Sequence, residues 1–233
     1  MTTIKDSVVL VTGGSRGIGK ELVEQLYQRG ASKVYATARD PKTVTHPEAV
    51  PLALEVTDPN SALAAAERAK DVTILINNAG ASTRADFLTS SEQDIRRDLE
   101  VNFYGPLWVT RAFVPVIEAN GGGHILNVHS VLSWYAAGGV YSASKAAIWS
   151  QTNTLRLQLL PRGITVTGLH VGYVDTDLTA SLDVAKIAPS VVAAKALDGI
   201  ESGAYEVLVD EISQRVKGAL SAPLEQLYPE LAK

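Results

Sequence analysis

The chain has 233 residues, of which 46% are hydrophobic and 20% charged, a composition typical of one globular α/β domain with a buried core. Its net charge of -4 argues against a nucleic-acid partner or a membrane-surface partner, because both classes of partner need a basic surface. It contains no cysteine, which excludes disulfides, thiolate metal sites and cysteine nucleophiles. No apolar stretch approaches the roughly 20 residues that span a bilayer, and the short polar start predicts no signal peptide and a cytoplasmic location.

Apolar runs of strand length alternate with longer helical patterns along the chain. The expected strands cover residues 8–11, 33–38, 50–54, 72–76, 124–128, 164–169 and 206–209, and the expected helices cover 17–29, 60–70, 91–120, 140–160 and 189–202. Near-continuous Val, Ile and Leu runs indicate strands buried on both faces of a parallel sheet. We therefore predict one domain over residues 1–233, a doubly wound, Rossmann-type parallel sheet of about seven strands with helices on both faces. The weakly patterned residues 175–188 are the predicted substrate lid.

A glycine-rich turn follows the first strand and leads into an amphipathic helix. It reads Thr12-Gly13-Gly14-Ser15-Arg16-Gly17-Ile18-Gly19. Glycines allow a sharp turn and the close approach of a pyrophosphate, while the first amides of the helix point at the anion. A tight turn without a ligand is the alternative, but the strand before it and the helix after it favour nucleotide binding.

The second strand ends in Ala38-Arg39-Asp40. In a dinucleotide fold, an acid at this place binds the adenosine ribose hydroxyls, whereas an arginine accommodates a 2′-phosphate. Ala38 is uncharged and Arg39 is basic, and Arg16 in the glycine turn could approach the same phosphate. These two arginines favour NADP(H) over NAD(H). Asp40 could still serve as the acidic partner if the strand ends one residue later.

Tyr141 and Lys145 lie four residues apart in a segment with a helical pattern. On a helix their Cβ atoms would be about 6 Å apart, so the ammonium would lower the pKa of the phenol. A tyrosine with a lowered pKa can exchange a proton near neutral pH. The spacing is common on ordinary amphipathic helices, so its meaning depends on the other motifs in the chain.

Taken together, the motifs resemble the short-chain dehydrogenase/reductase family in its single-domain branch. They are Thr12-Gly13-x-x-x-Gly17-x-Gly19, Asn77-Asn78-Ala79-Gly80, Ser130 and Tyr141-x-x-x-Lys145, within residues 7–179. The resemblance implies an NADP(H)-dependent oxidoreductase that interconverts a carbonyl and an alcohol by hydride transfer, with Tyr141 as general acid and base. It also implies that Lys145 tunes Tyr141 and binds the nicotinamide ribose. Ser130 would polarise the carbonyl, and Asn102 would hold a water of the proton relay.

The same resemblance supplies the cofactor-binding set. It comprises Gly13, Ser15, Arg16, Gly17, Ile18, Gly19, Arg39, Glu55, Val56, Asn78, Ala79, Gly80, Tyr141, Lys145, Val174 and Thr176. Glu55 and Val56 stand where the family usually has an aspartate beside the adenine, and Val171 stands where a proline is common. The loop before Tyr141 is shorter than usual and offers Ser133 as a rival to Ser130, which we prefer because it directly ends a strand. The C-terminus lacks the family's closing Asp-Gly-Gly.

Several expectations concern partners and alternatives. Leu132, Trp134, Tyr135 and Tyr173 predict a pocket for an apolar small-molecule substrate, and family analogy predicts a homo-oligomer, dimer or tetramer. No histidine pair has ligand spacing, so no metal is predicted; structural roles are expected for all four histidines, with His170 the first exception to test. A catalytically silent NADP(H)-sensing regulator, or an epimerase or dehydratase that uses the same Tyr and Lys, are the alternatives.

Overall fold

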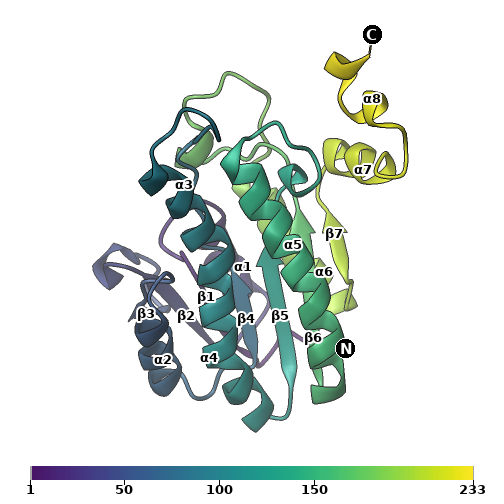
Figure 1. The fold of residues 1–233 in the computed structure, drawn as a ribbon. Helices are drawn as coiled ribbons and strands as arrows, with labels where there is room; N and C mark the ends of the chain where they lie inside the picture. Colours follow the sequence, from purple (N-terminus) through teal and green to yellow (C-terminus); the bar gives the residue numbers. More distant parts are fainter. Residues whose placement is uncertain (1, 233) are drawn as a thin grey trace.

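The computed structural model describes residues 2–232, so the two ends of the predicted domain, Met1 and Lys233, lie outside the described residues. A seven-stranded parallel sheet runs through the centre of the described chain, and helices cover both of its faces (Figure 1). Its strands are β1 (Val8–Val11), β2 (Lys33–Ala38), β3 (Val50–Ala53), β4 (Ile74–Asn77), β5 (Gly123–Val128), β6 (Ile164–His170) and β7 (Glu206–Leu208). The predicted fold class is confirmed.

The strand order places the start of the chain in the middle of the sheet. The order is β3-β2-β1-β4-β5-β6-β7, and every neighbouring pair is parallel. The chain winds outward from β1 to β3 on one side, returns to β4, and winds outward to β7 on the other side. Ligands of such sheets bind beyond the carboxyl ends of the strands at this reversal, which here lies between β1 and β4.

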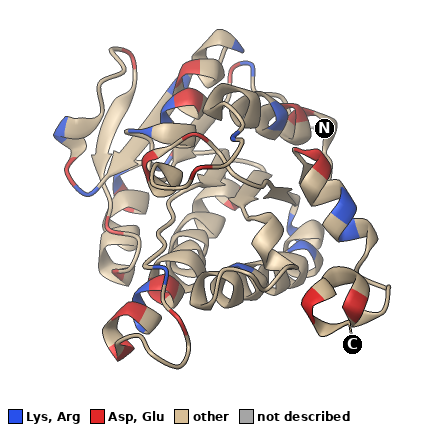
Figure 2. Ribbon diagram, turned by 90° about the horizontal axis from the view of Figure 1, so that it is seen from above, with Lys and Arg blue, Asp and Glu red and all other residues tan. Residues whose placement is uncertain are grey.

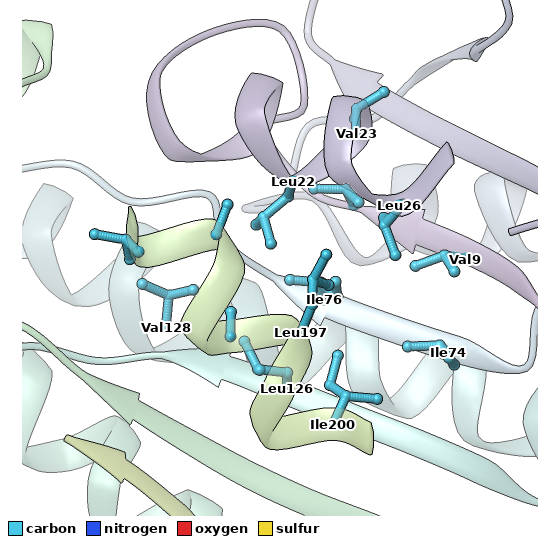
Figure 3. Packing of buried hydrophobic residues seen from close by; sticks show 14 of the residues in the cluster. Val9, Leu22, Val23, Leu26, Ile74, Ile76, Leu126, Val128, Leu197 and Ile200 are labelled. Atoms are coloured by element: carbon cyan, nitrogen blue, oxygen red, sulfur yellow. The ribbon is translucent and has the colours of Figure 1, made fainter. Parts of the chain in front are cut away.

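Two hydrophobic layers form because successive strand residues point to opposite faces of the sheet. The helices are α1 (Gly17–Gln28), α2 (Pro59–Arg68), α3 (Glu92–Leu99), α4 (Gly105–Ala119), α5 (Val140–Leu159), α6 (Pro189–Ser202), α7 (Glu211–Gly218) and α8 (Leu224–Leu227). On one face, α1 and α6 bury Val9, Ile76 and Leu126 (Figure 3). On the other face, α2, α4 and α5 bury the alternate strand residues, such as Leu10 and Leu75.

The helix predicted over residues 91–120 is present, but a wider turn divides it into two α-helical parts. Ser91 caps α3 by accepting a hydrogen bond from the amide of Asp94, and α3 is followed by a π-helical turn, Glu100–Tyr104, before α4 begins. The Gly105 amide donates to the carbonyl of Glu100, five residues back. A single wide turn of this kind leaves the apolar periodicity on either side almost unchanged, so the sequence pattern could not reveal it.

A third, smaller cluster joins the C-terminal helices to the loop after β5. Val131 and Trp134 of that loop pack with Val216 of α7, and Leu227 of α8 lies against them. The region where the family's closing tail is missing therefore packs beside the segment that follows Ser130. In Figure 1, α7 and α8 lie beyond the carboxyl end of β7.

The predicted lid, residues 175–188, is tied together at its base. The amide of Asp175 donates to the carbonyl of Ile187 at 2.9 Å, and the amide of Ile187 donates to the carbonyl of Tyr173 at 2.8 Å. Between these ends the segment forms one 3₁₀ turn, Asp177–Thr179. This turn reaches back to the glycine turn, where Asp177 pairs with Arg16.

Acidic and basic residues are interspersed over the outer helices and loops (Figure 2). Among the described residues, no helix has both the length and the apolar character that crossing a membrane requires.

Candidate active site

In the glycine turn between β1 and α1, two backbone segments pass so close to each other that no side chain fits between them. Gly13 and Gly17 have φ angles of +65° and +52°, in the left-handed region that favours glycine. A Cβ atom on Gly19 would lie 2.0 Å from the carbonyl oxygen of Gly13. Only glycine fits there, and α1 begins at Gly17 with its first amides directed toward the carboxyl end of β1. The turn thus has the geometry of a phosphate site.

Asn78, predicted to lie against the adenosine, uses its side chain to hold the glycine turn. Its Nδ2 donates to the carbonyl oxygens of Thr12 and Gly13, at 3.0 and 3.2 Å. In return, the Thr12 hydroxyl accepts hydrogen bonds from the amides of Asn78 and Ala79, at 2.9 and 3.0 Å. Sequence reasoning missed this function of Thr12, although the position of Thr12 at the end of β1, beside β4, was a usable signal. These hydrogen bonds join the loop after β4 to the glycine turn.

The end of β2 separates the roles of Arg39 and Asp40. The Asp40 carboxylate accepts a hydrogen bond from the amide of Lys42 at 3.0 Å and caps a 3₁₀ turn, Pro41–Thr43. The Arg39 side chain is exposed. Arg16, which was expected to reach the same phosphate, forms an ion pair of 2.8 Å with Asp177, and both side chains are about three-quarters exposed, 73% and 75%.

The predicted adenine-side pair is partly occupied by local contacts. The Glu55 Oε1 atom accepts hydrogen bonds from the amide and the hydroxyl of Thr57, at 3.2 and 2.9 Å. Val56 is buried against the start of α4, where a Cβ atom on Gly105 would lie 3.1 Å from its Cγ2 atom. The Glu55 carboxylate is therefore already hydrogen-bonded to Thr57, and Val56 contributes an apolar surface to the predicted adenine side of the site.

Tyr141 and Lys145 lie on the first two turns of α5, as predicted. The Lys145 ammonium is buried, donates to the carbonyl of Val128 at 3.0 Å, and lies 5.6 Å from the centre of the Tyr141 ring. Burial lowers the pKa of Lys145 to about 8, and the charge of Asp98 opposes this fall.

The predicted fall in the pKa of Tyr141 is not found. Burial raises its pKa, the charge of Asp98 adds to the rise, and a hydrogen bond with Ser130 opposes it. The reason is geometric: Lys145 bonds the carbonyl of Val128 and lies over the face of the Tyr141 ring. Burial removes water from the phenolate, and this desolvation determines the direction in which the pKa of Tyr141 shifts. The spacing of residues in the sequence cannot show this desolvation.

Ser130, and not its rival Ser133, is the serine whose side chain acts on the phenol of Tyr141 and opposes the rise of its pKa. It directly follows β5, and its hydroxyl also accepts a hydrogen bond from the amide of Leu132 at 3.1 Å, which caps the turn Val131–Ser133. Ser133 lines a groove with Tyr135 and Ser142. Trp134, predicted as a pocket wall, lines the same groove with Leu132 and Tyr135. Most of its ring is buried and stacks on His170, with ring centres 3.8 Å apart.

Asn102 sits in the π-helical turn and clamps the loop after β4. Its Oδ1 accepts from the amide of Ala81 at 3.0 Å, and its Nδ2 donates to the carbonyl of Ala81 at 2.8 Å and to the Ser144 hydroxyl at 3.0 Å. A Cβ atom on Gly80 would lie 3.3 Å from this Oδ1 and 3.8 Å from the Lys145 ammonium. The structure thus brings Gly80, Asn102 and Lys145 together, while the side chain of Asn102 is fully used and its relay water stays a prediction.

Asp98 is a charged neighbour of the site that the sequence interpretation missed. It is 0% exposed; its Oδ1 accepts from the amide of Thr83 at 2.8 Å, and its Oδ2 has no partner among the described residues. Burial raises the pKa of Asp98 itself, and its negative charge raises the pKa of both Tyr141 and Lys145. The spacing of four residues from Asn102 was the available signal, because such neighbours share one helix face.

The turn after β6 carries Val174 and Thr176, two of the predicted cofactor-binding residues. A Cβ atom on Gly17 would lie 3.1 Å from the Cγ2 atom of Thr176, so this turn lies directly against the glycine turn. Val171 replaces the usual proline, and the turn is fixed instead from α7: the Asp210 carboxylate accepts a hydrogen bond from the Gly172 amide at 2.7 Å.

Comparison with known proteins places this geometry in a family. The family model described as short chain dehydrogenase matches residues 7–186. A solved short chain dehydrogenase from Burkholderia cenocepacia J2315, in complex with NADP, is 35% identical, has a TM-score of 0.93, and is covered over 99% of both chains.

Two curated relatives extend this comparison. The NADPH-dependent 1-acyldihydroxyacetone phosphate reductase of Schizosaccharomyces pombe is 36% identical over 185 residues, which span 74% of this chain and 62% of that protein. An uncharacterized oxidoreductase of Staphylococcus saprophyticus is 29% identical over 242 residues, covering 92% of this chain and 99% of its own length. With the family model matching most of its residues, the chain belongs to the short-chain dehydrogenase/reductase family.

Proposed function

We propose that this chain is an NADP(H)-dependent oxidoreductase that interconverts a carbonyl and an alcohol by hydride transfer. The observation that carries the proposal is the convergence of Ser130 and Tyr141, whose hydroxyls influence each other, beside the buried ammonium of Lys145, which lies 5.6 Å from the centre of the Tyr141 ring. A phenol, a hydroxyl and an ammonium at one spot are suited to give a proton to a carbonyl oxygen.

The residues fit a dinucleotide. The glycine turn presents the first amides of α1, which suit a pyrophosphate, and Gly80 brings the loop after β4 close to the Lys145 ammonium, because a Cβ atom there would lie 3.8 Å from it. We infer that the nicotinamide ribose would lie beside this cation. Val174 and Thr176 would hold the carboxamide at the far end of the cleft. These contacts would place the reacting end of the cofactor beside Tyr141.

The cofactor is assigned as NADP(H) from the end of β2. Asp40 is used as a cap, so it is not the acid that would bind ribose hydroxyls, whereas the exposed Arg39 is available to a 2′-phosphate. Arg16 would join it on leaving Asp177. The NADP complex of the Burkholderia protein and the NADPH dependence of the Schizosaccharomyces reductase support this assignment.

NADPH, when bound, supplies the hydride. Tyr141 donates its proton to the substrate oxygen, on which negative charge develops, and its raised pKa keeps the phenol protonated at neutral pH. Ser130 fixes the same oxygen by a hydrogen bond. Alcohol oxidation needs the phenolate, so we infer that the reverse reaction gains rate as the pH rises and that reduction is favoured at neutral pH.

Three further parts of the proposal concern the substrate, the location and the assembly of the protein. Leu132 and the exposed Tyr173 are apolar surfaces near the site, which suits an apolar carbonyl compound. We expect a cytoplasmic protein that forms a homo-oligomer through α4 and α5, where Leu157 is 79% exposed. Light scattering of the purified protein would contradict the oligomer if it gave the mass of one protomer.

Tyr141→Phe is the test of the mechanism. We expect kcat to fall about 10³-fold on a panel of carbonyl compounds, because a general acid is lost, while the Kd for NADPH measured by fluorescence changes less than about twofold. Tyr205→Phe, at an exposed tyrosine away from the site, is the matched control and should keep wild-type kcat. Normal turnover by Tyr141→Phe would contradict the mechanism.

The wild-type protein separates the alternatives in the same assay. Tight NADPH binding without oxidation of NADPH by any compound in the panel would favour the silent NADP(H)-sensing regulator. Conversion of a substrate with no net change in added NADPH would favour an epimerase or dehydratase.

A further inference from the structure

A chain of buried polar groups ends at the backbone of Ser130. The Nδ1 atom of His170 lies 3.3 Å from the carbonyl oxygen of Ser130, and its Nε2 atom lies 3.1 Å from the Nδ1 atom of His129. The Nε2 atom of His129 lies 2.9 Å from the Thr152 hydroxyl. These three side chains are at most 2% exposed, and they come from β6, from the end of β5 and from α5.

The chain continues away from Ser130 into the sheet. Nδ2 of Asn127 donates to the Thr152 hydroxyl at 2.8 Å, and Nδ2 of Asn77 donates to Oδ1 of Asn127 at 2.8 Å. The backbone makes room for it: a Cβ atom on Gly168 would lie 2.6 Å from Cε1 of His129. The glycine in the middle of β6 therefore accommodates an imidazole ring.

The direction of every hydrogen bond follows from the end of the chain. A carbonyl oxygen only accepts, so Nδ1 of His170 must be the donor to Ser130. A neutral imidazole has one N–H, so Nε2 of His170 accepts from Nδ1 of His129, and Nε2 of His129 accepts from Thr152. The reverse order would direct a nitrogen lone pair at the Ser130 oxygen. The Thr152 hydroxyl is also placed to donate to the carbonyl of Ile148 at 2.8 Å, but it has only one proton. The Ile148 oxygen keeps its helical hydrogen bond without that proton, whereas Nε2 of His129 has no other donor among the described residues, so we assign the proton to His129.

Burial, together with the charged groups nearby, keeps both imidazole rings neutral at pH 7. Burial lowers the pKa of His170 to about 4, and burial also lowers the pKa of His129 well below its usual value, with His170, Lys145 and Arg156 adding to the fall at His129. Glu206 on β7 lies 3.7 Å from Nε2 of His170 and opposes the fall, but its carboxylate is shared with Lys217 of α7 and with the indole of Trp149. Neutral rings match the assignment of one proton to each.

We propose that His170 is a positioning residue for the catalytic serine, an inference that rests on the proposed function. The carbonyl oxygen of Ser130 accepts two hydrogen bonds, one from Nδ1 of His170 and one from the amide of Ser133 at 3.0 Å. Two donors fix the plane of this peptide group and hold the backbone that carries the Ser130 side chain in its place beside Tyr141.

The His170 ring is itself held from the other side. Trp134 stacks on it with ring centres 3.8 Å apart and an interplanar angle of 16°, and the Lys217 ammonium lies 4.8 Å from the centre of the Trp134 ring. The orientation of Ser130 therefore depends on α7 as well as on the sheet.

Two substitutions separate positioning from packing. His170→Phe keeps the ring that stacks on Trp134 but loses the donor to Ser130, whereas His170→Asn keeps an amide nitrogen near the Nδ1 position and leaves a void. We expect kcat to fall about tenfold in His170→Phe and less than about threefold in His170→Asn, with the Kd for NADPH within about twofold in both. A purely structural role predicts the opposite order, because Phe fills the site better than Asn.

The tautomers provide a readout that does not depend on turnover. In ¹⁵N NMR spectra of the wild-type protein between pH 6 and 8, His170 and His129 should both be neutral with the proton on Nδ1. A proton on Nε2 of His170, wild-type kcat in His170→Phe, or a lower kcat in His170→Asn than in His170→Phe would overturn the proposal. If wild-type protein reduced no carbonyl compound, the proposed function would fail while the tautomers still tested the hydrogen-bond chain.

Discussion

The glycine turn after β1 and the loop after β5 that begins at Ser130, here called the serine loop, both belong to the candidate site but are held in place by different kinds of contact. The turn is held by backbone atoms, with Asn78 and Thr12 as its principal side-chain partners. The serine loop is held by buried side chains from β6, α5 and α7. Substitutions in the turn should therefore appear in cofactor affinity, whereas substitutions around the loop should appear in kcat with affinity preserved.

Lys145→Met should have the largest effect, because Lys145 is proposed both to lie beside the catalytic tyrosine and to bind the cofactor ribose. We expect kcat/KM to fall by about 10³-fold or more, since the positive charge beside Tyr141 and the proposed ribose contact are both lost. Because the folded-state pKa of Lys145 is lowered to about 8, the wild-type fold should gain stability as the pH rises from about 8 toward 10.5. That gain should be missing in the variant when thermal unfolding is followed against pH; an unchanged pH dependence would contradict the burial of the ammonium.

Gly19→Ala should come next and should act through binding. Its Cβ atom would meet the carbonyl oxygen of Gly13 at 2.0 Å, so the turn must open and the Kd for NADPH should rise about 100-fold by fluorescence titration. Gly218→Ala, where no atom lies within 4 Å of the added Cβ, is the matched control and should bind as wild type does. If Gly19→Ala instead lowered kcat at unchanged affinity, the contrast between the two regions would fail.

Arg39→Ala should change the choice of cofactor by about tenfold. Loss of a charge-assisted contact to the 2′-phosphate should weaken NADPH binding and leave NADH binding unchanged. Asp40→Asn is the comparison, because an amide oxygen can still cap the turn that follows. A wild-type protein that binds NADH as tightly as NADPH would remove the role assigned to Arg39.

Asp98→Asn should give the smallest effect, a shift of the pH profile. Its charge raises the pKa of Tyr141, so the variant should begin alcohol oxidation at a lower pH than the wild type, with NADPH affinity preserved. The pKa of Asp98 is itself raised, so its ionised form disfavours the fold, and this cost grows as the pH rises through its titration. The variant should therefore unfold at a higher temperature at neutral pH; a shift of the profile to higher pH would contradict this electrostatic role.

Features made by neighbours in sequence were predictable. β1 and β2 have the predicted bounds, because continuous apolar runs flanked by turn residues define buried strands. The glycine turn was recognisable because its glycines, its strand and its helix are contiguous in the chain.

Features made by distant contacts or by burial were not predictable. The contact between His129 and His170 joins positions 41 residues apart, so the spacing within the chain gave no sign of it. The direction of the Tyr141 pKa depends on desolvation, which exists only after folding. Asp98 was hidden for the same reason, since a charged residue on a polar-patterned helix is usually solvated.

The hydrogen bonds at the base of residues 175–188 should allow this segment to be replaced as a unit. Asp175, Ile187 and Tyr173 hold its two ends side by side, whatever lies between them. The entropy of closing a loop grows slowly with its length, by about 0.6 kcal/mol for each doubling, so insertions at its tip should cost the fold little. If this segment is the predicted substrate lid, replacing it alone should change substrate preference without altering the sheet or the proposed catalytic tyrosine.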